Sequence, residues 1–374
     1  MTEGTSGRSP GRPAESPSAR PGGGAPEAAC YAALDLGTNN CRLLIAAPTR
    51  EGFRVVEAFS RIVRLGDGLS RTGRLDDAAM DRAVAALTIC AEKIRRRRPL
   101  RIRAVATQAC RIAENGSAFV DRVTEQTGIR LSVISTREEA KLSVAGCANL
   151  IDRSLDAALV IDVGGGSTEL SWVDLKASRS GPVSVGAWLS IPVGVVTLAE
   201  RFPEDATSSG PWYAAMVAHI REQIDAFRDA ERFRPVFDAG RAHLIGTSGA
   251  ITSLAGLHLG LQRYERSRVD GLWLTDLDCD AAADRLIGLG PAGRAAEPCI
   301  GPDRADLVLA GAAILRAVQD TWPCTRVRVA DRGLREGILL SLMAEGGSGQ
   351  RRRRRRRRSK PAGGSTAASP APAE

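Results

Sequence analysis

The sequence predicts an α/β protein made of two related halves with a cleft between them. Three observations support this prediction. Strand-like and helix-like segments alternate between residues 31 and 344, an Asp-containing hairpin motif occurs twice, and the two copies lie 127 residues apart. The chain has 374 residues, 43% of them hydrophobic, which suits about two domains of roughly 100–200 residues each.

The first half alternates strands and helices. Strands are expected at 31–36 and 41–47, joined by GTNN, with a third at 53–60. Apolar residues recur at helical spacing over 76–94, and the run Arg95 to Arg98 places cations at the C-terminal end of that helix. The next elements are a strand at 101–107, a helix at 116–127 between the N-cap Asn115 and Gly128, and a strand at 130–135.

The second half continues the alternation. Ser135 and Glu138 have the spacing of a capping box, which would open a helix at 137–150, and a strand at 158–163 follows. The later segments predict helices at 194–202, 211–230, from Ser248 onward, 279–288, 303–319 and 333–344, and strands at 243–247 and 325–330.

The two ends differ in composition from the folded body at about 29–345. Residues 1–28 and 346–374 have few large apolar side chains to offset the entropy of ordering, so we expect both to be disordered. The segment 346–374 carries +8 of the formal net charge of +9, mainly in Arg351–Arg358. This Arg run has two interpretations: non-specific contact with polyanions, including RNA, or a solvated tail.

Several classes of protein are not favoured. No window of 18 apolar residues occurs, and the N-terminus lacks the apolar region of a signal peptide, so we expect no membrane contact and a cytoplasmic location. The eight cysteines contain no CxxC spacing and predict buried, reduced thiols. The three histidines have no metal-binding spacing, which disfavours a His-based metal site.

The repeated motif aligns Leu34–Leu43 with Ile161–Leu170. Each copy has a strand, an Asp, an apolar residue, a Gly, a polar turn and a second strand. Successive N–H groups in a Gly-rich turn can surround an anion, although a hairpin turn without a ligand is the alternative. The expected phosphate-binding residues are Gly37, Thr38, Asn39 and Asn40 in the first copy and Gly164, Gly165, Gly166, Ser167 and Thr168 in the second.

Six segments resemble, in the same order, the exopolyphosphatase/guanosine pentaphosphate phosphatase (Ppx/GppA) family. They are YAALDLGTNNCRLLIA, VATQACRIAENG, STREEAKL, LVIDVGGGSTELS, LIGTSGAITSLA and LREGILL, and together they span about 30–344. The resemblance implies a duplicated actin-like, ribonuclease H-like fold. We expect domain I at 29–136, domain II at 137–332, and the helix 333–345 packing back on domain I.

The resemblance also implies an activity. Members release the terminal phosphate of polyphosphate or the 5′ γ-phosphate of guanosine pentaphosphate (pppGpp). Two departures limit the comparison. Asn40 stands where the family more often has a hydroxyl, and with only three His and a folded body expected to end near 345, we expect no C-terminal His-Asp type domain like that of longer members. We therefore expect the short, two-domain form. Dimers are common in the family, so a homodimer is one expected state.

Hydrolysis of a phosphoanhydride requires an anion cradle, charge neutralisation and an oriented water. The resemblance assigns the water-activating role to Glu139, whose alternative is an ordinary first-turn Glu stabilised by the helix dipole. Asp162 and Glu169 are expected to hold Mg²⁺ or another divalent cation, with Asp35 as the counterpart of Asp162. Glu169 is also a candidate for orienting the water.

Two further sets of residues are candidates for phosphate contact. Arg111 follows a strand and could bond two phosphate oxygens at once, with a surface ion pair as the alternative; Arg42 is a weaker candidate of the same kind. Gly246 and Ser248 lie between a strand and a helix start, where a phosphate or nucleotide could bind, although Ser248 could equally be a plain N-cap.

Three function classes remain open from the sequence. The first is a Mg²⁺-dependent hydrolase of polyphosphate, with pppGpp as a second substrate. The second is an actin-like ATPase or sugar kinase, which also uses Asp-containing phosphate loops. The third is a nucleic-acid-associated protein acting through the Arg tail, against which the low aromatic content of 4% counts.

Overall fold

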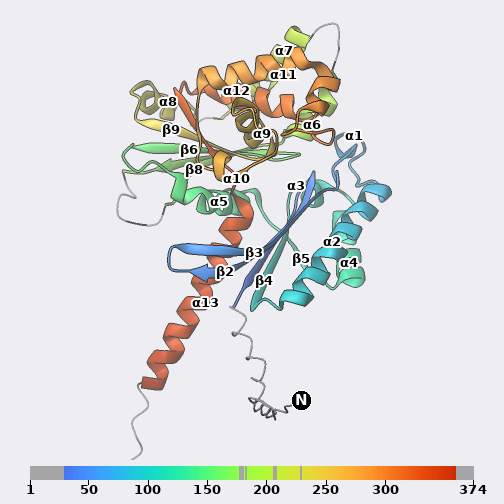
Figure 1. Cartoon of the computed structure of the whole chain (residues 1–374), viewed down its shortest axis with the longest axis vertical. Helices are drawn as coiled ribbons and strands as arrows, with labels where there is room; N and C mark the ends of the chain where they lie inside the picture. The colour runs from blue at the N-terminus through green and yellow to red at the C-terminus, as the bar shows by residue number, and fades with distance from the viewer. Residues whose placement is uncertain (1–28, 177–180, 182, 205–208, 228–229, 359–374) are drawn as a thin grey trace, which may run out of the picture.

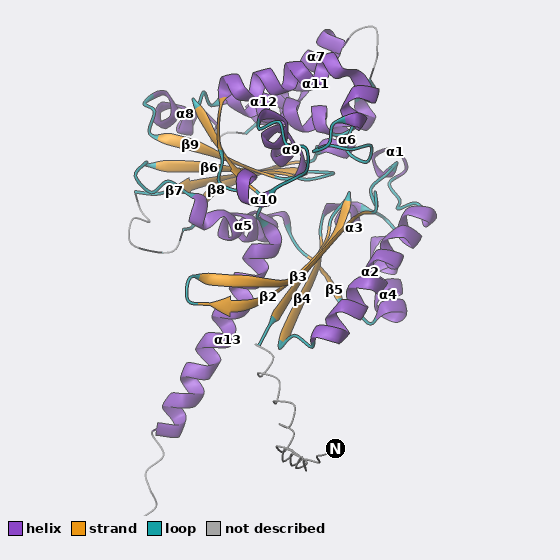
Figure 2. Cartoon of the chain, in the orientation of Figure 1, coloured by secondary structure: helices purple, strands orange, loops and turns teal. Residues whose placement is uncertain are grey.

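The computed structural model describes residues 29–176, 181, 183–204, 209–227 and 230–358. It shows two mixed β-sheets, one in each half of the chain, with helices on their faces (Figures 1 and 2). The segment 1–28, expected to be disordered, lies outside the described residues. Within the described residues, no helix has the length and apolar character needed to cross a membrane.

The first sheet has five strands in the order β3-β2-β1-β4-β5. β1 pairs antiparallel with β2 and parallel with β4. Apolar residues alternate along β1: Leu34 faces one set of helices and Ala33 the other, because successive side chains of a strand point to opposite faces. The strands are β1 (Tyr31–Leu36), β2 (Asn40–Thr49), β3 (Gly52–Ile62), β4 (Arg101–Ala106) and β5 (Leu131–Val133).

The second sheet repeats this arrangement. Its order is β10-β11-β9-β6-β7-β8, in which β6 pairs antiparallel with β7 and parallel with β9, as β1 does with β2 and β4. The shared topology confirms the predicted duplicated α/β fold. The strands are β6 (Ala157–Val163), β7 (Thr168–Asp174), β8 (Val185–Ile191), β9 (Ala242–Thr247), β10 (Trp273–Thr275) and β11 (Arg326–Ala330).

Helices α2 and α4 of the first half cover one face of the first sheet, and α5 then leads to the first strand of the second sheet. Phe119 of α4 and Leu87 of α2 pack on the face that includes Leu34. The helices are α1 (Leu69–Thr72), α2 (Asp77–Arg97), α3 (Gln108–Ile112), α4 (Gly116–Thr127) and α5 (Thr136–Cys147), followed by the 3₁₀ turn η1 (Ala148–Leu150).

Most helices of the second half pack on the outer face of the second sheet. Leu159 and Ile161 of β6 lie in this large apolar core. The helices are α6 (Val195–Arg201), α7 (Ser209–Asp225), α8 (Ala230–Asp238), α9 (Gly249–His258), α10 (Arg266–Val269), α11 (Asp276–Ala296), α12 (Val308–Thr321) and α13 (Leu334–Arg358).

Helix α5 lies between the two sheets (Figure 2). Its Leu142 packs with the first sheet, and its Val144 and Cys147 pack with the second. The C-terminal helix α13 packs beside it, where Ile338 and Leu339 cover the remaining face of the first sheet. Both helices therefore begin close to the space between the sheets.

The predicted helix ends are partly correct. Ser135 caps α5 by accepting from Glu138 N, and Gly128 ends α4 in the left-handed region. Glu138 does not complete a capping box, because its carboxylate pairs with Arg103 of β4. The Asn115 side chain does not cap α4; it bonds the Leu75 backbone instead, accepting from N–H and donating to the carbonyl.

Some elements were missed or misjudged in length. The short elements α3, α10 and β10 were missed because three to five residues show no clear period, and β8 was also missed. The expected helix 211–230 is replaced by α7 and α8, and residues 228–229 between them lie outside the described residues. Helix α11 is longer than 279–288, with a kink at Gly290, and the helix expected from 303 begins at Val308.

The predicted end of the last helix near residue 344 is wrong. Helix α13 extends to Arg358 and so includes part of the segment 346–374 that was expected to be disordered. Arginine is a good helix former, so the Arg run can continue a helix that its preceding glycines disfavour by about 1 kcal/mol each. Residues 359–374 lie outside the described residues.

Candidate active site

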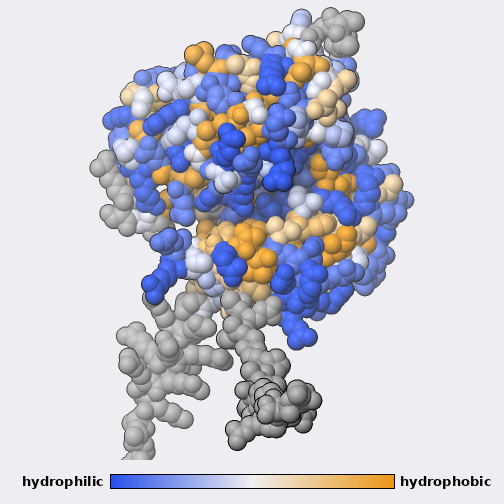
Figure 3. All heavy atoms as spheres, viewed as in Figure 1, coloured by the Kyte–Doolittle hydropathy of each residue, from blue (hydrophilic) through white to orange (hydrophobic). Residues whose placement is uncertain are grey.

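A cavity of about 370 Å³ lies between the two halves. The space-filling view shows the hollow between the halves, with hydrophilic residues in it (Figure 3). Both copies of the repeated hairpin line the cavity, together with the start of α5, the start of α9 and the residues that lead into α13. Of the predicted site residues, the cavity wall includes Asp35, Gly37, Thr38, Asn39, Asn40, Arg42, Glu139, Asp162, Gly164, Gly165, Gly166, Ser167 and Ser248.

The first hairpin tip is a tight turn closed by a hydrogen bond from Gly37 N to Asn40 O at 2.8 Å. Asn39 is buried, and its Oδ1 atom has no hydrogen-bond partner within the described residues. The same holds for Asp35 Oδ1. Burial raises the pKa of Asp35 to about 6, although the nearby Arg42 opposes the shift. Buried polar atoms are normally hydrogen-bonded, so the two unpaired acceptors, Asn39 Oδ1 and Asp35 Oδ1, indicate a ligand site and not a closed core.

The second hairpin tip has the same turn, closed from Gly164 N to Ser167 O at 2.8 Å. The two tips approach each other closely: a Cβ atom on Gly165 would lie 3.0 Å from Asn39 N. This position therefore needs glycine for space. Backbone N–H groups and hydroxyls of both tips can therefore contribute to the binding of one anion in the cavity.

Glu139 projects from the first turn of α5 and is 8% exposed. Arg111 Nη1 donates to Glu139 Oε2 at 3.2 Å and to Ile134 O at 2.8 Å. Burial raises the pKa of Glu139 to about 9, and the Glu169 carboxylate adds to this shift while Arg111 opposes it. A buried carboxyl with a strongly raised pKa beside a cavity is typical of a proton-transfer group.

Two further carboxyls lie behind the second tip. Glu169 is 2% exposed and accepts from Ser190 Oγ at 2.9 Å. Burial, with the charge of Asp162, raises the pKa of Glu169 to about 7. Asp162 accepts from Ser143 Oγ at 2.5 Å, and burial raises its pKa as well.

The carboxyl oxygens suit a hard cation. Asp35 has an unpaired Oδ1 atom, and Asp162 faces the same cavity from the other half. No group of three or more His, Cys, Asp or Glu residues among the described ones is placed to enclose a metal ion. Mg²⁺ usually takes one or two carboxylates and fills its other positions with water and substrate phosphate, so Asp35 and Asp162 are the residues that could hold it.

Not every predicted residue lies on the cavity wall. Arg111 donates to the Glu139 carboxylate, and Glu169 lies close enough for its charge to raise the pKa of Glu139. Thr168 is buried, and its hydroxyl donates to Val193 O at 2.8 Å. Gly246 lies inside β9 against Ile251. Its predicted phosphate contact has no support in this position. Ser248 does line the cavity, and its side chain also caps α9 by accepting from Ile251 N.

The sequence did not lead us to expect the cavity residues just before α13 and in its first turn. Asp331, Arg332, Arg335 and Glu336 line the cavity. Arg335 lies in LREGILL, one of the six segments that resemble the family, so the sequence contained a motif that could have pointed to it. Arg304 lies in none of these segments. Burial lowers the pKa of Arg335, with the nearby Arg42 contributing. Neither Arg335 nor Arg42 has a side-chain hydrogen bond or ion pair within the described residues, so both are available to an anion.

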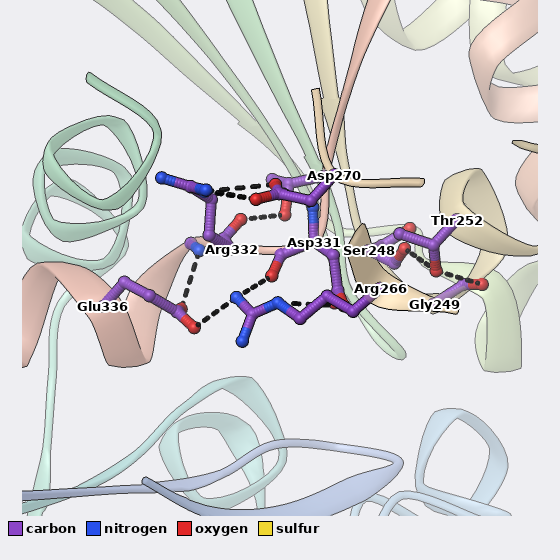
Figure 4. A network of polar contacts seen from close by, with 10 residues as sticks. Ser248, Gly249, Thr252, Arg266, Asp270, Asp331, Arg332 and Glu336 are labelled. Carbon is purple, nitrogen blue, oxygen red and sulfur yellow. Dashed lines mark hydrogen bonds and ion pairs between the residues drawn. The ribbon is translucent and has the colours of Figure 1, made fainter. Parts of the chain in front are cut away.

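A polar network fixes this segment (Figure 4). Arg332 pairs with Asp270, and Arg266 pairs with Asp331 and Glu336. Glu336 also accepts from Gly333 N at 2.9 Å. The network holds the turn before α13 and thereby the direction in which Arg335 points.

The fold and site define a class: a duplicated α/β protein with a polar, carboxyl-containing cavity between its halves. Residues 44–345 match the profile of the Ppx/GppA phosphatase family. The chain belongs to this family.

Known proteins support this membership. "Exopolyphosphatase 2" of Mycobacterium tuberculosis is 31% identical over 328 residues, which cover 83% of this chain and 98% of that protein. A solved exopolyphosphatase-like protein is 33% identical with a TM-score of 0.73, covering 84% of this chain and 98% of its own. The Aquifex aeolicus family member is 25% identical with a TM-score of 0.69, covering 85% and 98%.

Proposed function

We propose that the protein is an exopolyphosphatase, which hydrolyses the terminal phosphoanhydride bond of inorganic polyphosphate. The observation that carries the proposal is the position of Glu139: a buried carboxyl, paired with Arg111, beside a cavity where two anion-binding turns face each other. The relatives named for this activity share almost the whole folded chain.

In this proposal, the terminal phosphate binds between the two hairpin tips. Backbone N–H groups at Thr38–Asn40 and Gly165–Ser167 contact its oxygens, and Arg42 and Arg335 neutralise its charge. The Asp35 and Asp162 carboxylates would hold Mg²⁺, which would supply charge neutralisation at the phosphate oxygens. Glu169 does not line the cavity; it accepts from Ser190 and adds its charge near Glu139.

Glu139 acts as the general base in its ionised form. Burial raises its pKa in the metal-free site, and a cation held by Asp35 and Asp162 would favour the carboxylate. The Glu139 carboxylate accepts a proton from water as the water oxygen bonds to the terminal phosphorus. The bond from that phosphorus to the bridging oxygen breaks, and the shortened chain leaves with the electron pair. Arg111 holds the Glu139 carboxylate in place and stabilises its ionised form, because its guanidinium opposes the rise in pKa.

Phosphate release tests the proposal directly. The full chain with Mg²⁺ is given long polyphosphate, short polyphosphate, pppGpp and ATP side by side. We expect the highest kcat/KM with polyphosphate. Faster turnover of ATP, with ADP as product, would instead support an actin-like ATPase or sugar kinase. No turnover of any polyphosphate would reject the proposal, and the pppGpp result decides whether a second substrate is used.

A further inference from the structure

The segment 63–70, between β3 and the end of α1, contacts the back of the first hairpin tip. Val63 N and Arg64 N both donate to Asn39 O, at 2.9 and 3.0 Å. Gly66 N donates to Thr38 O at 2.9 Å. The carbonyl groups of the first tip point away from the cavity into this segment, so the segment determines where the tip lies.

The same segment reaches the second half of the molecule. Glu200 of α6 accepts from Gly68 N at 2.8 Å and from Ser70 Oγ at 2.6 Å, so both of its carboxylate oxygens are used. Arg64 donates to both oxygens of Asp306, at 2.9 and 3.2 Å. Arg64 has φ of 46°, which is unfavourable for a residue other than glycine and indicates a constrained backbone at this crossing.

The N-terminal end of α6 contacts the back of the second hairpin tip. Val195 N donates to Gly164 O at 3.0 Å, and Val196 N donates to Gly165 O at 2.8 Å. A Cβ atom on Gly194 would lie 2.4 Å from Gly164 O, so glycine is needed for this close approach. Glu200 lies one turn further along the same short helix.

These contacts form a continuous path from one hairpin tip to the other. The path runs from Thr38 and Asn39 through segment 63–70 to Glu200, and then along α6 to Gly164 and Gly165. It lies behind the tips, and its central link, Glu200, is absent from the cavity wall. The path therefore can set the distance between the tips without touching a ligand.

We propose that Glu200 is a positioning residue that sets the spacing of the two anion-binding tips. The inference rests on the proposed function, because spacing matters when one phosphate is contacted from both tips. Small displacements of binding groups have large effects on turnover: about 1 Å can cost on the order of 10²-fold. Loss of Glu200 lets the tips separate, while the cores of both halves stay intact.

The test compares Glu200→Ala, Glu200→Gln and the control Glu231→Ala in the full chain. Glu231 is an exposed carboxylate of α8 that pairs with Arg234 on the same helix and does not line the cavity, so its loss removes a similar charge away from the tips. With Mg²⁺ and long polyphosphate, we expect Glu200→Ala to lower kcat by about 10-fold or more. We expect Glu200→Gln to recover much of the loss, because its amide oxygen can still accept from Gly68 N.

Hydrogen exchange supplies a readout that does not depend on activity. If Glu200 joins the tips, Glu200→Ala speeds amide exchange at Val195 and Val196 as well as at Gly66 and Gly68, with the melting temperature close to that of the control. Faster exchange confined to 66–70, or a kcat equal to the control, overturns the inference. If the wild-type chain releases no phosphate, the proposed function fails, and the exchange pattern alone decides the role of Glu200.

Discussion

The two hairpin tips share a backbone and differ in charge. Each is closed by the same 2.8 Å hydrogen bond from its first glycine to the residue three positions on. Asp35 faces Arg42 across the first hairpin, whereas Asp162 faces Glu169 across the second. Equivalent positions of the repeat therefore carry a cation in one half and a carboxyl in the other.

This difference suggests a division of work within a duplicated fold. The first tip, with Arg42 and the nearby Arg335, has the positive charge that phosphate oxygens need. The second tip gathers Asp162 and Glu169 close to Glu139. In addition to burial, the Glu169 and Asp162 charges raise the pKa of Glu139, and the Asp162 charge raises that of Glu169. That half has the oxygen atoms that a divalent cation and a reacting water need.

The largest expected effect comes from Glu139, the carboxyl beside the second hairpin tip. Glu139→Ala should lower kcat on polyphosphate by roughly 10²-fold or more, the usual cost of losing a general base. Binding of polyphosphate should survive, as measured by calorimetry. Glu138→Ala is the matched control, because Glu138 is the next residue in the chain and its carboxylate pairs with Arg103 and not with Arg111. Near-normal turnover in a folded Glu139→Ala protein rejects the assignment.

The next effect tests the close approach of the tips. Gly165→Val places a Cβ atom 3.0 Å from Asn39 N, closer than van der Waals contact, so the first tip must shift where the phosphate is expected to bind. We expect a raised KM and a large loss of activity, with a melting temperature close to wild type. Gly210→Val is the control, since a Cβ there meets nothing within 4 Å. If Gly165→Val lowers stability as much as it lowers activity, the second tip is better explained as a structural hairpin turn that binds no ligand.

A smaller effect concerns pH. The pKa of Glu139 is raised to about 9 in the folded protein, against about 4.3 in an unfolded chain. The stability contributed by its neutral form is fully present below pH of about 4.3 and is lost as pH rises towards 9. In EDTA, the melting temperature of Glu139→Gln should therefore fall less than that of wild type between pH 5 and 9. Parallel curves contradict the raised pKa.

The smallest effect lies outside the cavity. Truncation after Glu345 removes the Arg run, which carries most of the net charge. We expect weaker binding of long polyphosphate at low salt, an unchanged kcat, and little difference at physiological ionic strength, where the Debye length is about 8 Å. Unchanged long-chain binding at about 10–20 mM salt shows that the run has another role.

The sequence predicted the duplicated hairpins because their pattern is local: a buried strand, an Asp, and a Gly-rich turn. The motif around α5 also led to the expectation that Glu139 faces the cleft, and Glu139 lines the cavity; its catalytic role stays a prediction. Arg335 was missed although the LREGILL motif contains this residue. Arg304 could not be predicted, because no motif marks it and it reaches the cavity only through the packing before α12. The domain boundary at 136/137 stays a prediction, since α5 packs on both sheets.

The division of charge between the tips can be measured by two calorimetric titrations. Mg²⁺, and separately polyphosphate in EDTA, are titrated into wild type, Asp162→Asn and Arg42→Gln. We expect Asp162→Asn to weaken Mg²⁺ binding by about 10-fold or more, and to leave polyphosphate binding unchanged. We expect Arg42→Gln to weaken polyphosphate binding without weakening Mg²⁺ binding, because it removes a positive charge beside Asp35 and Asp162. If each variant loses both ligands equally, or neither ligand is affected, the two tips do not divide the work.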